Sequence, residues 1–258
     1  MLLCAVVPLH AAGLPDTGQF ACYTDTAVDD ALAAESESVA RDTGTHPRQD
    51  CRYGPDAAAI AGKLAKVGAG AKGFDYTKIA NNGAALAAAT ALGGAASDWA
   101  CTRDNITGLT WEIKASSAMS LRYQGSTYTW YNPLALTNGG DAGTLNGSAT
   151  CLNVAPLTNC NTQDFAAAVN AGQLCTYSDW RLPTRRELLT LVKADGSNPA
   201  IDSTWFPNTP SAEFWTSTTY VPSAPEAWLV IFTGVGRTGH YGKAGNTGHV
   251  RLVRGAPF

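Results

Sequence analysis

Charged residues are scarce in this sequence, and it has no basic excess. Asp, Glu, Lys and Arg make up 15% of the 258 residues, and the formal net charge is −3. Nucleic acids and anionic membrane surfaces select proteins with a basic field, so neither is an expected partner. No apolar run approaches the roughly 18 residues that a membrane-spanning helix needs, so no transmembrane segment is expected. The hydrophobic content of 45% is nevertheless that of a globular protein.

Metal-binding spacings are also missing among the cysteines. None of them stands in a C-x-x-C pair, and no paired histidines accompany them, so a zinc site is not expected. Residues 1–13 form an apolar stretch that ends in small residues, which is typical of a secretory signal peptide. A buried N-terminal strand is the alternative for this stretch.

Six cysteines remain beyond the expected signal peptide, and an even number in an exported protein predicts three disulfides. They are Cys22, Cys51, Cys101, Cys151, Cys160 and Cys175. We expect Cys22 and Cys51 to pair with each other inside the N-terminal half. Reduced, buried cysteines in a cytosolic protein are the alternative. The cysteines therefore favour a protein that is secreted or held at the cell surface.

Residues 14–100 form an Ala- and Gly-rich N-terminal region with weak patterning. Ile60, Leu64 and Val67 follow Pro55 at helical spacing and predict a short amphipathic helix. The alanine-rich block 83–96 has the propensity for a second helix, although alanine offers little side chain to pack. The sequence does not indicate whether this region folds independently.

Residues 101–258 change to short aromatic and β-branched runs separated by Gly, Asn and Pro. Two helices are predicted, one from the Asn161 cap to Ala171 and one that begins with the capping box of Thr184 and Glu187. Strands are predicted at 109–113, 127–131, 214–220, 227–233 and 249–254. Helices segregated against antiparallel sheets make this an α+β domain.

Five blocks carry a resemblance that covers residues 101–255. They are Asp104–Glu112, Asp179–Leu188, Phe214–Thr218, Ala227–Val230 and Val250–Gly255. In this order they resemble the C-terminal domain family of the Legionella collagen-like adhesin. The resemblance implies a C-type-lectin-like fold, a bacterial surface or secreted location, a sulfated-glycan ligand and a homotrimer. It also implies kinship with formylglycine-generating-enzyme-like proteins and with variable proteins that retroelements diversify, whereas the negative net charge departs from a heparin binder.

The sequence gives little support for an enzymatic activity. Ser217, His240 and Asp202 could be imagined as a hydrolase triad, but no nucleophile-elbow motif surrounds the serine. Formylglycine generation needs reactive cysteines near the C-terminus, and none follows Cys175. No Glu-Pro-Asn or Trp-Asn-Asp tripeptide suggests calcium-dependent sugar binding. We therefore expect no enzymatic activity, no cofactor and no metal.

Aromatic and arginine side chains are the next candidates for ligand contact. Trp111, Trp215 and Trp228 alternate with polar residues on predicted strands. Each of them either stacks on a sugar ring as a platform or packs in the core. A core position is the commoner case for tryptophan, and we predict it for all three.

The arginine-rich block 180–188 is predicted to be structural and not a ligand contact, because Pro183, Thr184 and Glu187 account for it as the start of a helix. Arg185 and Arg186, on the first turn of that helix, are the arginines expected to be exposed.

The most informative segment is 233–248, which contains six glycines between two predicted strands. Its other side chains resemble the adaptable contact residues of paratopes, and residues 227–258 carry four basic residues and no acid. An ordinary exposed hairpin loop is the alternative. The predicted ligand-binding residues are Tyr220, Arg237, His240, Tyr241, Lys243, Asn246 and His249. The sequence thus favours a non-enzymatic, exported binding protein for an extracellular glycan or protein, with a structural subunit of a surface appendage as the alternative.

Overall fold

The computed structural model describes residues 54–145, 151 and 157–257, together with Asp16 and one short strand pair. In that pair, β1 (Cys22–Tyr23) runs antiparallel to β2 (Val28–Asp29). The expected signal peptide at 1–13 and the side chains of the expected Cys22–Cys51 pair lie outside the described residues.

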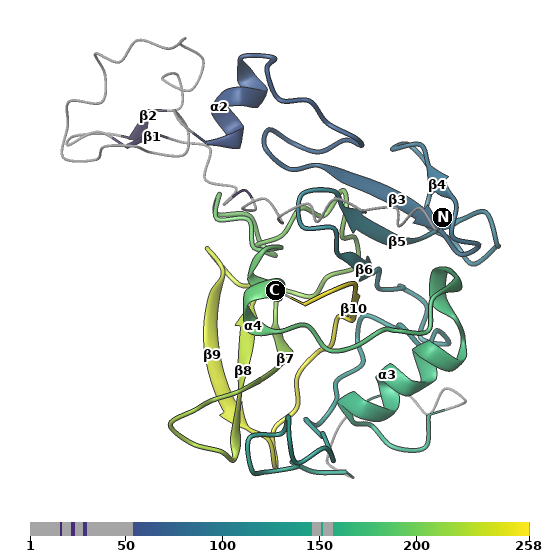
Figure 1. Cartoon of the computed structure of the whole chain (residues 1–258), viewed down its shortest axis with the longest axis vertical. Coiled ribbons are helices and arrows are strands. Elements are labelled where there is room, and N and C mark those ends of the chain that lie inside the picture. Colours follow the sequence, from purple (N-terminus) through teal and green to yellow (C-terminus); the bar gives the residue numbers. More distant parts are fainter. Residues whose placement is uncertain are drawn as a thin grey trace, which may run out of the picture.

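Two further antiparallel sheets organise the chain (Figure 1). The five-stranded sheet has the order β10-β6-β5-β3-β4. Its strands are β3 (Tyr76–Ala80), β4 (Ala85–Leu86), β5 (Trp99–Asp104), β6 (Thr110–Glu112) and β10 (Val253–Arg254). Because Val253 pairs with Trp111, the C-terminal strand closes this sheet beside an element from the middle of the chain.

The three-stranded sheet has the order β7-β8-β9. Its strands are β7 (Glu213–Thr219), β8 (Glu226–Ile231) and β9 (Arg237–Gly242). The prediction of a loop over 233–248 is wrong for Arg237–Gly242, because each residue of this strand, β9, pairs with a residue of β8. The turn is confined to 233–236, where Gly236 has a φ of 71° and a Cβ would lie 2.3 Å from Val192 Cγ1. Glycines suggested a loop because they are depleted in strands, yet an outer strand tolerates them.

The helices are short, and two of them begin where the sequence predicts. The described helices are α2 (Pro55–Ile60), α3 (Thr162–Ala171), η3 (Leu174–Thr176) and α4 (Arg185–Leu189). The two that begin as predicted are α3 and α4. Asn161 caps α3 by accepting from Asp164 N at 2.8 Å, and Gly172 ends that helix. None of the described helices is long and apolar enough to span a membrane.

Three local predictions need correction. The block 83–96 forms β4 and turns instead of a helix, because alanine side chains contribute little packing. Within this block, the Thr90 carbonyl accepts a hydrogen bond from Lys78 Nζ. The helix after Pro55 stops at Ile60, just before Gly62 adopts a φ of 67°. The expected strand 127–131 is present as isolated bridges from Tyr128, Thr129 and Tyr131 to distant residues.

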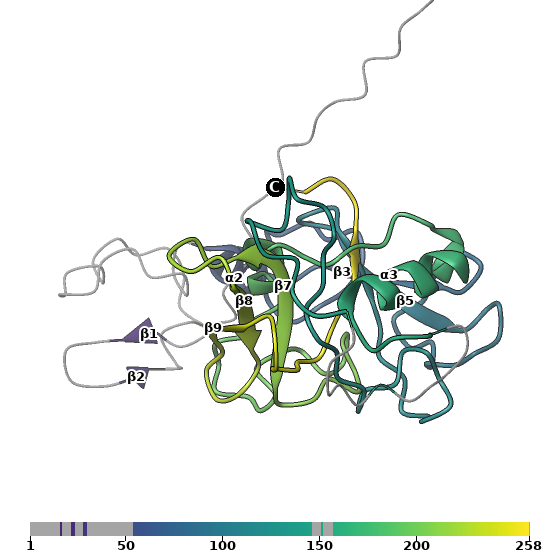
Figure 2. The same cartoon turned by 90° about the horizontal axis from the view of Figure 1, so that it is seen from below.

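Two apolar clusters form the core. One surrounds α3 and includes Tyr128, Trp130, Phe165, Trp180 and Trp215. The other joins the five-stranded sheet to α4 and the three-stranded sheet and includes Tyr76, Trp111, Leu188, Phe206 and Phe214. Figures 1 and 2 both show α3 and β9 on opposite sides of the domain. Burial of Trp111 and Trp215 is as predicted.

Disulfides connect elements of the α3 cluster. Cys101 of β5 is bonded to Cys175 of η3, and Cys151 is bonded to Cys160 just before α3. These are two of the three expected bonds. The α+β arrangement with antiparallel sheets, predicted from the sequence, is likewise confirmed.

Candidate ligand-binding groove

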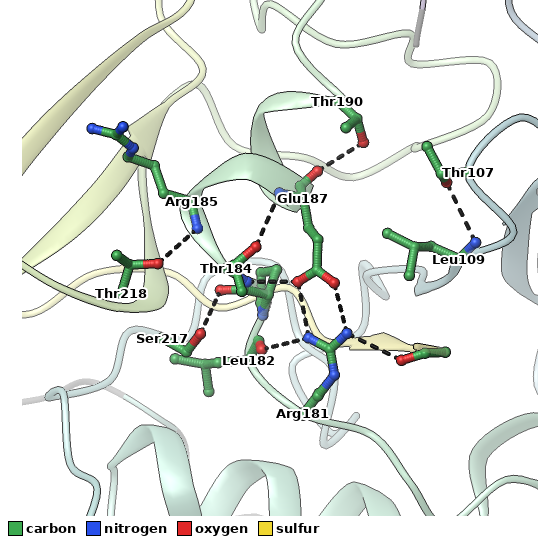
Figure 3. Close-up of polar contacts among 12 residues, drawn as sticks. Thr107, Leu109, Arg181, Leu182, Thr184, Arg185, Glu187, Thr190, Ser217 and Thr218 are labelled. Atoms are coloured by element: carbon green, nitrogen blue, oxygen red, sulfur yellow. Dashed lines mark hydrogen bonds and ion pairs between the residues drawn. The ribbon is translucent and has the colours of Figure 1, made fainter. Parts of the chain in front are cut away.

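The start of α4 is fixed by a network around Glu187, whose side chain is buried (Figure 3). Arg181 donates to both carboxylate oxygens of Glu187, at 2.9 and 2.6 Å, and to the carbonyl oxygens of Leu182 and Gly255. The same carboxylate accepts from Thr184 N at 2.7 Å, while Thr184 Oγ1 accepts from Glu187 N at 3.2 Å. The predicted capping box is therefore confirmed, and an arginine clamps it to the C-terminal segment.

This anchored turn lies against the end of β7. Arg185 N donates to Thr218 Oγ1 at 3.0 Å, and Ser217 N donates to Pro183 O at 2.8 Å. Figure 3 shows the Arg185 side chain pointing away from the Glu187 network. Between the two elements lies an open groove of about 430 Å³, which we call the α4–β7 groove. It is lined by Thr184, Arg185, Arg186, Thr218, Thr219, Tyr220, Val221, Pro222 and Trp228.

An aromatic cluster forms one wall of the groove. The Arg185 guanidinium carbon lies 4.2 Å from the centroid of the Trp228 ring. Tyr220 meets Trp228 edge-on at 5.1 Å and stacks parallel to His240 at 4.0 Å. The His240 Nδ1 atom in turn contacts the Glu226 carboxylate. Trp228 is only half-buried, which corrects its predicted place in the core: the short helix α4 covers this face of β8 incompletely.

Two guanidinium groups give the groove a basic character. Arg186 is exposed as predicted, whereas Arg185, which was also expected to be exposed, is half-buried beside the Trp228 ring. Within the described part of the chain, nothing accepts a hydrogen bond from either guanidinium; Arg185 is held by its backbone and by Trp228. Arginine presents its donors in a planar fork that matches carboxylate, sulfate and phosphate oxygens. The groove therefore combines apolar rings with free donors for an anionic group.

The predicted ligand-binding residues do not form one cluster. Tyr220 and His240 lie together at the groove. Arg237 is exposed at the opposite end of β9, where it pairs with Ile231. Tyr241 alternates to the other face of β9, where its hydroxyl lies 3.4 Å from a Glu213 carboxylate oxygen.

Three more predicted residues lie in the segment after β9. Asn246 is exposed, and its side chain donates to the Gly242 carbonyl at 3.1 Å. His249 is half-buried with its ring 5.3 Å from that of Phe214, and burial lowers its pKa. Lys243 is fully buried. Burial lowers the pKa of Lys243, and Asp141 opposes that shift. A buried ammonium cannot meet a ligand in this conformation, so Lys243 belongs to the support of the surface and not to its contacts.

The imagined hydrolase triad is not assembled. Ser217 Oγ donates to the Pro183 carbonyl at 3.2 Å, and His240 contacts Glu226. Asp202 accepts from the backbone of Thr204 in its own turn. Among the described residues, no group of three or more His, Cys, Asp or Glu side chains is arranged to hold a metal ion.

The comparisons with known proteins concern the region that builds the groove. The family model of the Lcl C-terminal domain matches residues 100–254. No curated protein and no solved structure matches the chain significantly. Because the matched region runs from β5 into β10, it includes every element of the α4–β7 groove.

Proposed function

The chain belongs to the Lcl C-terminal domain family, and from this premise we propose that it is a non-enzymatic binding protein of the cell surface or the extracellular space. Its domain over 100–254 would have a C-type-lectin-like fold. The ligand would be a glycan, bound in the α4–β7 groove. The observation that carries this proposal is the Arg185–Trp228–Tyr220 cluster, in which free guanidinium donors lie beside half-buried aromatic rings.

The chemistry of the groove fits a sugar with an acidic substituent. Small-ligand sites combine apolar walls with a few convergent polar groups, and an aromatic ring can stack on the apolar face of a pyranose. Arg185 and Arg186 would take the acid group, and Thr218 would offer a hydroxyl. The overall charge of −3 argues against a broadly basic surface, but the residues that line this groove include two arginines and no acidic residue.

Glycan-array screening of the whole protein, followed by titration of the strongest hit, tests the proposal. Arg185→Ala and Tyr220→Ala should each weaken binding by about 1–3 kcal/mol, the range of anchoring arginine and aromatic contacts. Arg237→Ala is the matched control, since it removes an exposed arginine at the far end of β9. Loss of binding in the Arg237 variant, with affinity retained in the other two, would place the ligand on β9 and refute the groove.

The alternative function, a structural subunit of a surface appendage, is favoured by one observation. Within the described part of the chain, β9 is an outer strand of its sheet, and outer strands can pair with a neighbouring copy. Sedimentation of the purified protein without ligand tests this function. Assembly that grows with protein concentration, and that persists when Arg185 is replaced, would support the appendage subunit over the glycan receptor.

A further inference from the structure

Lys243 directly follows β9, and its ammonium is enclosed by oxygen atoms of the chain itself. Its Nζ donates to the carbonyls of Asn138 at 2.6 Å and Asp141 at 2.9 Å, and to Thr219 Oγ1 at 3.3 Å. The ring of Trp130 closes the enclosure, with its centroid 4.3 Å from Nζ. The three donors of the ammonium thus meet three oxygens and one π-face, while no water-facing surface remains.

These oxygens belong to segments that have no regular pairing with each other. Asn138 and Asp141 lie in the irregular loop 132–145, and Thr219 is the last residue of β7, beside Tyr220. Thr219 Oγ1 also donates to the Asn138 carbonyl at 3.1 Å. The loop and the β7–β8 connection therefore meet at one point, and the ammonium lies at that point.

A carbonyl-rich enclosure is the environment in which proteins hold hard cations. The two carbonyl dipoles, with no carboxylate oxygen in contact with the ammonium, would repel each other if the positive charge were removed. The aromatic face adds attraction for a cation. A neutral side chain of similar length would fill the volume but remove the Lys243 donor from the Asp141 carbonyl and one of the donors to the Asn138 carbonyl, and the loss of a donor to a partly buried carbonyl is costly.

We propose that the Lys243 ammonium is an internal cation that holds loop 132–145 against the β7–β8 connection, the structural work that a bound metal ion does in other loops. The binding surface beside Tyr220 is thereby ordered without a metal. Lys243 is a positioning residue: it acts on Tyr220 through Thr219 and has no contact with ligand. The consequence for binding rests on the proposed function, whereas the clamp is tested without ligand and can be refuted independently of that function.

Hydrogen exchange of the ligand-free protein tests the clamp. Lys243→Met keeps the aliphatic stem and removes the charge. Amides of the loop that are hydrogen-bonded, such as Asn138 N to Leu134 O, should exchange about tenfold faster because the loss of charged hydrogen bonds opens the loop. Amides of β3 and β5, which pair with each other in the five-stranded sheet, serve as the internal control and should be unchanged. Loop exchange that stays within about twofold of wild type would overturn the proposal.

Chemical rescue separates a cation requirement from simple packing. Lys243→Ala deletes an n-propylammonium fragment, so millimolar propylammonium should restore loop protection, whereas tetramethylammonium at equal ionic strength, which has no N–H donors, should not. Wild-type loop exchange should be unaffected by EDTA. Rescue by both cations alike, or loss of wild-type protection in EDTA, would contradict an ammonium clamp.

A milder variant keeps the proposal testable if the Lys243 substitutions unfold the protein. Thr219→Val removes one oxygen of the enclosure and leaves both carbonyls. It should raise exchange of the loop by at least about threefold, because the hydroxyl both accepts from Lys243 and donates to the Asn138 carbonyl, while β3 and β5 remain protected. Unchanged loop exchange in this variant would refute the clamp.

Discussion

Replacing Arg181 by methionine is the sharpest test of how the groove is held in place. The change keeps an unbranched apolar stem and removes the guanidinium that clamps the buried Glu187 carboxylate to the Leu182 and Gly255 carbonyls. Glu187 would remain buried with Thr184 N as its remaining donor among these contacts. We expect a large loss of stability, because the charge stays buried when its partner is gone.

The magnitude follows from the exposure of the two side chains. Breaking a buried ion pair costs about 3–5 kcal/mol, but the Arg181 side chain is 30% exposed against 0% for Glu187. Water can therefore reach the site once the guanidinium is removed, which places the expected loss at the lower limit, about 3 kcal/mol. This is a large part of the 5–15 kcal/mol that usually separates the folded and unfolded states.

Equilibrium unfolding in urea, followed by tryptophan fluorescence, measures the loss. Arg254→Met is the matched control: its ion pair with Asp179 is well formed but exposed, with 24% and 55% of the two side chains accessible. That variant should lose about 1–2 kcal/mol, because it removes this exposed ion pair and the contact of the Arg254 guanidinium with the Tyr177 ring, whose centroid lies 3.8 Å away. Arg181→Met combined with Glu187→Gln should be more stable than Arg181→Met alone, because the buried charge is gone. Equal losses in the two arginine variants, or no recovery in the double variant, would refute a buried-charge origin.

Three further predictions concern stability. Thr184→Ala should cost about 1 kcal/mol, the value of a helix cap; although Thr184 lines the groove, its hydroxyl accepts from Glu187 N, so ligand affinity in a titration should be unchanged, and lost affinity at unchanged stability would make the cap a contact. Opening the Cys101–Cys175 disulfide, which closes a separation of 74 residues, should cost about 4 kcal/mol by the chain-entropy relation, measured by urea unfolding of the double serine variant; a loss under about 1 kcal/mol would contradict it. Burial lowers the pKa of Lys114 from 10.5 to about 8, so the unfolded chain binds more protons between these values and stability should rise with pH there. Above about pH 10 the raised pKa of Tyr128 opposes this trend, since Tyr128 then ionises in the unfolded chain before it does in the folded one. Burial also lowers the pKa of Lys78 and of Lys243, so urea midpoints across this range should rise less in Lys114→Met than in wild type; an identical rise would exclude Lys114 as a source.

Features encoded by neighbouring residues could be predicted from the sequence. Asn161 and Gly172 bound α3 because a cap needs only the backbone of its own first turn and an ending that glycine permits. The capping box of Thr184 and Glu187 follows the same logic. These signals are complete within a few residues, so distant parts of the chain do not alter them.

Features that depend on distant partners could not be predicted. β9 is a strand because β8 offers a full register of hydrogen bonds, although its glycines are typical of a loop. Trp228 is half-buried because α4, some forty residues earlier in the chain, covers it incompletely. Lys243 looked like an exposed contact because its acceptors, Asn138 and Asp141, lie about a hundred residues away.

The blocks that carry the family resemblance supply Arg185, Thr218 and Trp228 of the groove and leave Tyr220 and His240 outside them. Arg185 and Thr218 belong to these blocks, and their contact fixes α4 against β7. Tyr220 and His240 lie beyond the blocks, yet they stack on each other beside Trp228. The framework that orients the arginine is thus separate from the residues that shape the aromatic edge. For the proposed glycan site, it follows that substitutions at Tyr220 and His240 should change which ligand fits without disturbing the Arg181–Glu187 clamp that holds the groove.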